Sequence, residues 1–80
     1  MPDTGLTPLS YFWNNGSQAR DLREWGFELL IVRREAREFF WTCTDGTLMF
    51  KGVGPERSRQ KCLTMAYEEV TKARKENAHP

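Results

Sequence analysis

The stretch that decides the fold is FFWTCTDGTLMF, which runs from Phe39 to Phe50. Asp45 and Gly46 stand at its centre, and this pair tolerates the positive φ angles of a two-residue type I′ turn. Aromatic and β-branched residues, which favour strands, lie on both sides of the turn. The stretch therefore predicts a β-hairpin in which Trp41 faces Phe50.

The register of this hairpin divides its side chains between the two faces of a sheet. Successive residues of a strand point to opposite faces, so every second side chain belongs together. One predicted face is wholly apolar and must lie in the core; it holds Phe39, Trp41, Cys43, Leu48 and Phe50. The second face is mixed and holds Phe40, Thr42, Thr44, Thr47, Met49 and Lys51. We expect a helix to cover the first face.

A further strand precedes the hairpin. The run FELLIVRR, from Phe27 to Arg34, is rich in aliphatic residues and predicts a strand with apolar side chains on both faces. The charged linker from Arg33 to Glu38 returns the chain to the hairpin, but its residues do not specify a turn type. The register of this strand pair therefore stays open, and so does the choice of residues that share a face with Phe40.

The last part of the chain predicts one long helix. Gly52 and Gly54 end the last strand, and either Pro55 or Ser58 can begin the helix. From there to Glu76, apolar residues recur at three- and four-residue steps and form one stripe, which consists of Cys62, Leu63, Ala66, Tyr67, Val70 and Ala73. We expect this stripe to pack on the core face of the sheet.

The N-terminal part predicts a short and irregular helical segment. Thr7, which is followed by a proline, favours a helical turn through Trp13. Ser17 can cap a second short helix over residues 18–25, and Gly26 suits the position after its end. The apolar side chains of both helices can fold back over the second face of the sheet. A second protein chain is the alternative cover.

Together these elements predict one small α+β domain over residues 1–80. A short helical N-terminal segment (1–26) leads into a three-stranded antiparallel β-meander (27–52), which is packed against one long C-terminal helix (55–76). The chain is 39% hydrophobic and 29% charged, a composition that favours folding over disorder. The net charge of +1 lacks the strong basic excess that is typical of nucleic-acid-binding domains.

The sequence indicates neither a membrane nor a secretory pathway. No apolar run approaches the roughly 18 residues that a membrane-spanning helix needs. The first residues show no basic segment followed by an apolar one, as a signal peptide would. We therefore expect a cytoplasmic protein without a membrane partner, in which Cys43 and Cys62 are reduced. In a secreted protein these two cysteines could instead form a disulfide.

The sequence offers few groups that could carry out catalysis. The only histidine, His79, lies one residue from the end, where chains tend to fray. Cys43 and Cys62 fall on predicted core faces, where a thiol behaves as a small apolar group. No residues show metal-ligand spacing, and the segment 52–58 lacks the spacing of a phosphate loop. We therefore expect a non-enzymatic protein with no catalytic, cofactor-binding or metal-binding residue and no small-molecule substrate.

Two surfaces are candidates for binding, and the first is the second face of the sheet. Phe40 and Met49 are joined there by three of Phe27, Leu29, Leu30, Ile31 and Val32, depending on the register, and we select Phe27, Leu29 and Ile31. A contiguous exposed apolar patch marks an interface. The face predicts binding to a protein partner or self-association, of the kind by which small bacterial or phage accessory proteins modulate a larger assembly.

The second candidate surface is basic. It consists of Arg33, Arg34, Arg37, Lys51, Arg57 and Arg59, although glutamates interrupt it. Arginine makes bidentate contacts with phosphate and guanine. In topology, a three-stranded sheet backed by one helix is similar to the plant AP2 domain and to the arm-binding domains of tyrosine recombinases. This resemblance implies a sheet face that enters a DNA groove, so a small DNA-binding protein is the alternative function.

Overall fold

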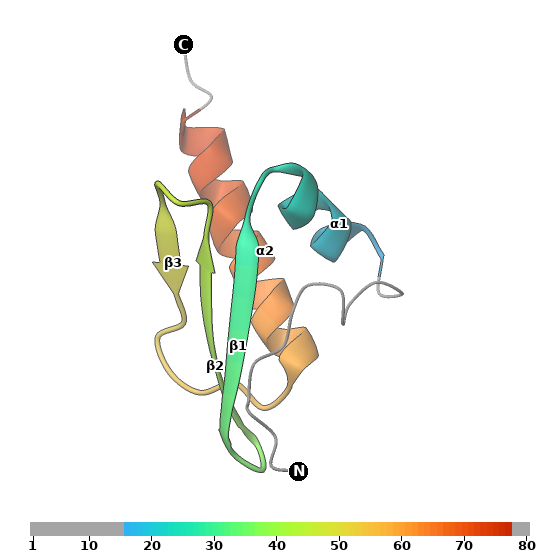
Figure 1. The fold of residues 1–80 in the computed structure, drawn as a ribbon, viewed down its shortest axis with the longest axis vertical. Coiled ribbons are helices and arrows are strands. Elements are labelled where there is room, and N and C mark those ends of the chain that lie inside the picture. Colours follow the sequence, from blue (N-terminus) through green and yellow to red (C-terminus); the bar gives the residue numbers. More distant parts are fainter. Residues whose placement is uncertain (1–15, 78–80) are drawn as a thin grey trace.

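The structure is a computed structural model that describes residues 16–77 (Figure 1). Its elements in chain order are α1 (Ser17–Glu24), β1 (Glu28–Glu35), β2 (Glu38–Thr44), β3 (Met49–Lys51) and α2 (Arg59–Asn77). The three strands form one antiparallel sheet in the order β1-β2-β3. The predicted α+β meander with a long C-terminal helix is therefore confirmed. The helical turn expected between Thr7 and Trp13 lies outside the described residues.

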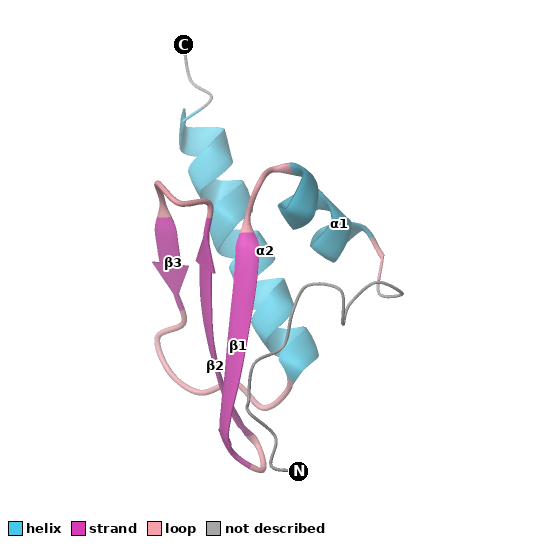
Figure 2. Ribbon diagram, viewed as in Figure 1, coloured by secondary structure: helices cyan, strands magenta, loops and turns pink. Residues whose placement is uncertain are grey.

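The described residues form two layers, the sheet and the helices behind it (Figure 2). α2 crosses the back of all three strands, and α1 packs against α2. The core between the layers consists of Ala19, Leu22, Phe27, Leu29, Ile31, Phe39, Trp41, Cys43, Cys62, Leu63, Ala66 and Val70. Ala19 and Leu22 come from α1, so this helix lies on the same side of the sheet as α2. The expectation that it covers the second face is wrong.

α1 ends where Gly26 predicts its end, but its N-terminus is not capped by the residue that we expected. Gly26 has a φ of +87°, and the N–H of Phe27 donates to the carbonyl of Leu22 over 2.8 Å. This is the Schellman arrangement, in which a left-handed glycine closes the last turn. At the other end, Gly16 is the N-cap and no side chain caps the helix. The predicted cap by Ser17 is wrong, because Ser17 is already helical.

The pairing of β1 with β2 settles the register that the sequence left open. Leu29 lies opposite Cys43, and Ile31 lies opposite Trp41. Together with Phe27, these β1 side chains point into the core, with exposed fractions of 1% for Leu29, 0% for Ile31 and 6% for Phe27. The selection of Phe27, Leu29 and Ile31 for the second face is therefore wrong, because α2 covers the face on which they lie.

The loop between β2 and β3 is longer than the two-residue turn that we expected. It comprises four residues, 45–48, between the end of β2 and the start of β3. Oδ1 of Asp45 accepts hydrogen bonds of 2.8 Å from the backbone N–H groups of Thr47 and Leu48. These bonds stabilise the longer loop, in which Gly46 has a φ of +93°. The aspartate therefore organises the loop through its side chain, and not only through its backbone.

The longer loop shifts the hairpin register by two residues. Cys43 pairs with Phe50, and the N–H of Gly52 donates to the carbonyl of Trp41 over 3.1 Å. A shift by two residues leaves every side chain on its predicted face, because the side-chain period of a strand is two. Two residues that were predicted to lie in the strand, Thr47 and Leu48, are in the loop instead, and Leu48 is 39% exposed there. Its predicted place in the core is wrong.

α2 begins at the later of the two predicted starts. Oγ of Ser58 accepts a 3.1 Å hydrogen bond from the N–H of Lys61, which is the geometry of a helix N-cap. The start at Pro55 is wrong, because this part of the chain is extended. Glu56 forms an isolated antiparallel bridge with Phe39 through backbone hydrogen bonds of 2.8 and 2.9 Å. The connection thus runs beside β2 before the helix begins.

Candidate interaction surface

The face of the sheet that points away from the helices is called the open face below. It consists of Glu28, Leu30, Val32, Phe40, Thr42, Thr44, Met49 and Lys51, which alternate with the core residues along their strands. Leu30, Val32 and Met49 are three of the five large hydrophobic residues that are exposed among those described. The open face therefore gathers most of the exposed apolar side chains of the described chain.

Leu30, Val32 and Phe40 form the apolar centre of the open face. Val32 lies directly opposite Phe40, and Leu30 is its neighbour on the same face of β1. Leu30 is 41% exposed and Val32 is 39% exposed, whereas Phe40 is half-buried. Met49 is 62% exposed, but it lies opposite Thr44, so threonines separate it from the centre. The apolar patch is thus a cluster of three residues, and Met49 lies apart from it.

One sequence signal could have identified Leu30 and Val32 in place of the residues that we selected. Glu28 has the same parity along β1 as these two residues, whereas Phe27 has the opposite parity. A glutamate is almost never fully buried unless it is paired, so its face of a strand is the one that meets solvent. The charge at the start of β1 therefore indicates which of its two apolar faces stays open.

Charged side chains surround the apolar centre. The strand pairing is irregular between Arg33 and Glu35, and the guanidinium carbon of Arg34 lies 5.5 Å from the centre of the Phe40 ring. At this distance a cation is attracted by the face of an aromatic ring. Glu28 and Lys51 mark other borders of the open face. An apolar centre with a charged rim is the usual composition of a protein interface.

The basic residues proposed for nucleic-acid binding do not gather on the open face. Among them, only Lys51 belongs to it, and Arg34 borders it through its contact with the Phe40 ring. These two residues come from the two edge strands. Arg33 has the parity of the core residues of β1. The guanidinium carbon of Arg59 lies 5.0 Å from the centre of the Phe39 ring, on the core side of β2. A flat sheet face lined with arginine is therefore absent from the described residues.

Several of these basic residues instead approach the end of the molecule where β1 turns into β2. We call this region the hairpin end. The bridge between Phe39 and Glu56 brings the connection before α2 next to this turn. The hairpin end therefore carries Arg33, Arg37, Arg57 and Arg59 together with the acidic residues Glu35, Glu38 and Glu56. Because positive and negative side chains alternate there, the positive electrostatic potential that a phosphate backbone would meet is weak.

A stack of side chains holds α1 against α2. The rings of Trp25 and Tyr67 lie 5.7 Å apart at an angle of 19°, and the guanidinium carbon of Arg74 lies 4.0 Å from the centre of the Trp25 ring. The hydroxyl of Tyr67 donates to Oδ2 of Asp21 over 2.9 Å. This hydrogen bond raises the pKa of the Tyr67 hydroxyl, because the carboxylate favours the protonated phenol. The cluster has a structural role, since its members contact one another.

The two cysteines are buried and unreactive in the native fold. Cys43 and Cys62 are free thiols, each with an exposed fraction of 0%. Burial raises the pKa of Cys43 to about 12 and that of Cys62 to about 11, with nearby carboxylates adding to the effect. Both thiols are therefore protonated at neutral pH. His79 lies outside the described residues, and within residues 16–77 no three His, Cys, Asp or Glu side chains could hold a metal ion.

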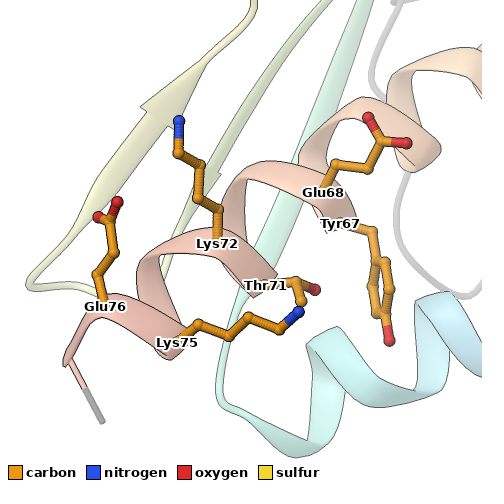
Figure 3. Close-up of a pocket in the computed structure, with 6 residues that line it drawn as sticks. All are labelled: Tyr67, Glu68, Thr71, Lys72, Lys75 and Glu76. Carbon is orange, nitrogen blue, oxygen red and sulfur yellow. The ribbon is translucent and has the colours of Figure 1, made fainter. Parts of the chain in front are cut away.

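A shallow groove of about 350 Å³ runs along α2 (Figure 3). Its described lining consists of Tyr67, Glu68, Thr71, Lys72, Lys75 and Glu76, all from this helix. Tyr67 points toward α1, whereas Lys72 and Glu76 lie on the side nearer β3 (Figure 3). Glu68, Lys72 and Glu76 follow one another at the four-residue spacing of helix ion pairs. The groove has the balanced charge of a solvated helix face.

Neither the helices of the structure nor comparisons with known proteins assign the protein to a class. No helix within the described part of the chain combines the length and the apolar character that crossing a bilayer requires. Comparisons of the chain with protein-family models, with curated proteins and with solved structures gave no match. The function proposed for the protein therefore rests on the open face and on the charges around it.

Proposed function

We propose that the protein is a non-enzymatic interaction module that binds another protein through the open face. The observation that carries this proposal is the apolar centre, where Leu30 and Val32 stay 41% and 39% exposed beside Phe40. Apolar side chains that are contiguous and bordered by charges are typical of binding surfaces. α1 and α2 occupy the opposite side of the sheet, so neither helix covers this centre.

The energetics of the centre favour a binding site with few dominant residues. Complete burial of an aliphatic or aromatic side chain stabilises a complex by roughly 1.5–3 kcal/mol. In protein interfaces a few residues near the middle contribute most of the affinity. Val32 and Phe40 occupy that position here. The guanidinium of Arg34, which lies over the Phe40 ring, can contact a partner that binds there. A centre of this size suits an accessory protein that modulates a larger assembly.

The proposed setting of this activity is the cytoplasm. What supports this part of the proposal is the state of the two cysteines, Cys43 and Cys62, which are both free. Small domains that work in oxidising compartments generally use their cysteines in disulfides. A protein that keeps two buried thiols reduced therefore suits a reducing compartment, where bacterial and phage modulators act.

The test compares two substitutions of valine by glutamate. Val32 lies in the apolar centre, whereas Val53 is fully exposed in the connection after β3, outside the strands. Immobilised protein is used to capture partners from an extract of the source cells, and each captured protein is then purified and titrated by calorimetry. We expect Val32→Glu to weaken binding at least about tenfold, because a charge is buried against apolar atoms. Val53→Glu should bind like the wild type.

Two results would contradict this proposal. One is equal affinity of Val32→Glu and the wild type for the captured partner, which would show that the partner binds elsewhere. The other is the absence of any protein that binds the wild type and not Val32→Glu. Circular dichroism of both variants checks that the fold is kept, as expected for exposed positions.

A second candidate function is DNA binding through the hairpin end. The observation that favours it is the approach of Arg57 and Arg59 to Arg33 and Arg37 across the bridge between β2 and the connection. Arginine side chains at the end of a hairpin can contact two phosphates or a base edge. This function differs from the first in its dependence on salt, because phosphate contacts weaken steeply as salt is added.

A further inference from the structure

The loop between β2 and β3 contains the dipeptide Asp45-Gly46, whose backbone is open to a spontaneous rearrangement. The side-chain carboxyl carbon of an aspartate can reach the backbone nitrogen of the residue that follows it. A glycine in that next position has no Cβ atom to hinder the approach. Gly46 has a φ of +93°, and both residues are exposed. The dipeptide is thus chemically reactive, and it is in contact with the water that the reaction needs.

The rearrangement requires no enzyme and no reactant other than water. The backbone nitrogen of Gly46 attacks Cγ of Asp45, so that a carbon–nitrogen bond forms, the amide proton is lost and one carboxyl oxygen leaves as water. The product is a cyclic imide, a succinimide. Water then adds to one of its two carbonyl carbons and breaks the bond between that carbon and nitrogen. Breakage of the new bond restores aspartate, whereas breakage of the original peptide bond leaves the main chain running through Cγ, as isoaspartate.

Both reacting groups are held by hydrogen bonds in the folded loop. The N–H of Gly46 donates to Oγ1 of Thr44 over 3.0 Å, which fixes the plane of the peptide group that would attack. Oδ1 of Asp45 accepts bonds of 2.8 Å from the N–H groups of Thr47 and Leu48. A reaction of this kind needs a particular alignment of nucleophile and carbon. The hydrogen bonds therefore oppose any movement of either group toward that alignment.

Thr44 connects the two sides of this arrangement. Its hydroxyl donates to the carbonyl of Leu48 over 2.6 Å, while the same oxygen accepts from the N–H of Gly46. The N–H of Asp45 donates to the carbonyl of Leu48 as well, over 3.3 Å. Loss of the Thr44 hydroxyl would therefore remove two of the bonds that close the loop, and one of them restrains the attacking nitrogen.

The same loop keeps the carboxyl group of Asp45 in its less reactive form. The hydrogen bonds from the N–H groups of Leu48 and Thr47 hold the pKa of Asp45 below its ordinary value, because they favour the ionised carboxylate. An oxygen leaves more readily as water when the carboxyl group is protonated. The folded loop therefore restrains the geometry of the reaction and also lowers the amount of the reactive, protonated acid.

We propose that Asp45-Gly46 is a site of spontaneous isoaspartate formation, and that the hydrogen bonds of the loop set its rate by allowing the reaction only when the loop opens. Loops of a folded protein open locally without unfolding of the core. When opening and closing are fast, a reaction of the open form follows its equilibrium population. The inference goes beyond the proposed function, because it concerns the covalent state of the chain and needs no partner.

Isoaspartate would change the loop that controls its own formation. The main chain becomes longer by one carbon, and the carboxylate moves from Cβ to Cα, so the acceptor for Thr47 and Leu48 is displaced. Thr44 pairs with Met49 directly beside the loop. We expect the modified loop to stay open and this pair to separate.

The first measurement compares the folded and the unfolded chain. The full chain is incubated at neutral pH in buffer and in guanidinium chloride, and the peptide that contains Asp45 is separated by chromatography into its aspartate and isoaspartate forms. We expect isoaspartate to form about tenfold more slowly in the folded chain, the ratio that corresponds to ~1.4 kcal/mol. Equal rates would overturn the proposal, as would the absence of isoaspartate from the unfolded chain.

The second measurement compares two substitutions of threonine by valine. Thr44→Val removes the acceptor of the Gly46 N–H, whereas Thr42 is equally half-buried on the same face of β2 and lies outside the loop. Each folded rate is divided by the rate of the same variant in denaturant, which removes any effect on intrinsic reactivity. Thr44→Val should raise this ratio about threefold to tenfold, the usual value of a hydrogen bond. Thr42→Val should match the wild type. Equal ratios for the two variants would overturn the role of Thr44.

The third measurement needs no variant, so it holds even if Thr44→Val fails to fold. The amide of Gly46 exchanges its hydrogen only when its bond to Thr44 is broken. Its protection in the wild type should therefore equal the ratio of the unfolded to the folded rate of isoaspartate formation. Agreement of the two values supports control by loop opening. An unprotected Gly46 amide in a chain that rearranges slowly would overturn it, because the hydrogen bonds would then not set the rate.

Discussion

At the scale of single residues, Trp41 and Gly52 show how one side chain determines the identity of another. Trp41 is 3% exposed and packs across the backbone that follows β3. A Cβ atom on Gly52 would lie 2.5 Å from Nε1 and 2.8 Å from Cδ1 of the indole. The glycine is therefore required by packing against a large ring. In the sequence it indicated only the end of a strand.

Gly52→Ala should lower the free energy of unfolding by about 1–3 kcal/mol, the usual cost of forcing an extra methyl into a packed core. The indole cannot move away freely, because it is enclosed by the core. Gly54→Ala is the control, since a Cβ atom there would have no neighbour within 4 Å. Its effect should stay within about 0.5 kcal/mol. Urea denaturation of both variants measures the difference, and equal stabilities would show that Trp41 yields to the methyl group.

The buried thiols predict how stability changes at alkaline pH. Burial raises the pKa of Cys43 to about 12 and that of Cys62 to about 11, from an ordinary thiol value of 9.0. Between these values the unfolded chain binds fewer protons than the native protein, so stability falls as the pH rises. The contribution of the thiols is complete below pH 9.0 and is lost toward pH 11 and 12.

The double variant Cys43→Ala, Cys62→Ala should lack this alkaline loss. It starts less stable than the wild type at neutral pH, because two buried side chains become smaller. The stability difference between the two proteins should shrink above pH 9, as measured by urea denaturation at a series of pH values. Tyr67 also titrates in the alkaline range, but it is present in both proteins, so its effect cancels. A constant difference at every pH would contradict the prediction.

At the scale of secondary-structure elements, the two helices begin in different ways although a serine stands near the start of each. Ser58 accepts a hydrogen bond from the N–H of Lys61 and caps α2. Ser17 is the first residue of α1, where Gly16 is the N-cap and no side-chain cap is made. Residue type alone therefore does not identify a cap, because the residue must also stand outside the helix with its oxygen facing the first turn.

Ser58→Ala should destabilise the protein by about 1 kcal/mol, the typical cost of losing a helix cap. Ser17→Ala should cost clearly less, because it removes no cap hydrogen bond and alanine is the better helix former. Both residues are exposed, so burial contributes little to either value. Thermal unfolding of the two variants measures the contrast. A larger loss for Ser17→Ala would mean that the cap of α2 contributes little.

At the scale of the whole molecule, the arrangement of charge and apolar surface separates the two candidate functions. One side of the sheet is covered by both helices, and the other exposes the apolar centre. The arginines gather at the hairpin end, where Glu35, Glu38 and Glu56 lie among them. The net charge of the chain is only +1. This distribution favours desolvation of the open face over attraction to a phosphate backbone.

We therefore expect no shift of duplex DNA at micromolar protein and physiological salt. The hairpin end can contact about three to five phosphates, and its nonspecific dissociation constant should be roughly 10⁻⁴ M or weaker. A mobility-shift experiment on mixed-sequence DNA over a series of salt concentrations measures this. Arg37→Ala and Arg57→Ala identify the surface if a shift is found. A tight, salt-sensitive shift that these variants abolish would reverse the ranking of the two functions.

Features that depend on neighbours in the chain could be predicted from the sequence. The three strands, the long helix, the glycine that closes α1 and the cap at Ser58 each follow from a few adjacent residues. Apart from Leu48, the faces of the hairpin were also correct, although its loop was longer than expected, because a shift by two residues preserves the side-chain period. Phe40 and Met49 were placed on the second face for this reason.

Tertiary structure decided which face of β1 is covered and where α1 packs. Leu29 and Ile31 are as apolar as Leu30 and Val32, so β1 could bury either pair. The choice depends on the register with β2, which buries the first pair under α2 and leaves the second on the open face. Such long-range packing joins residues that are distant in the sequence, and the only local signal for it is the charge of Glu28 at the start of β1. The sequence determined the elements of this protein, and packing between them determined its exposed surface.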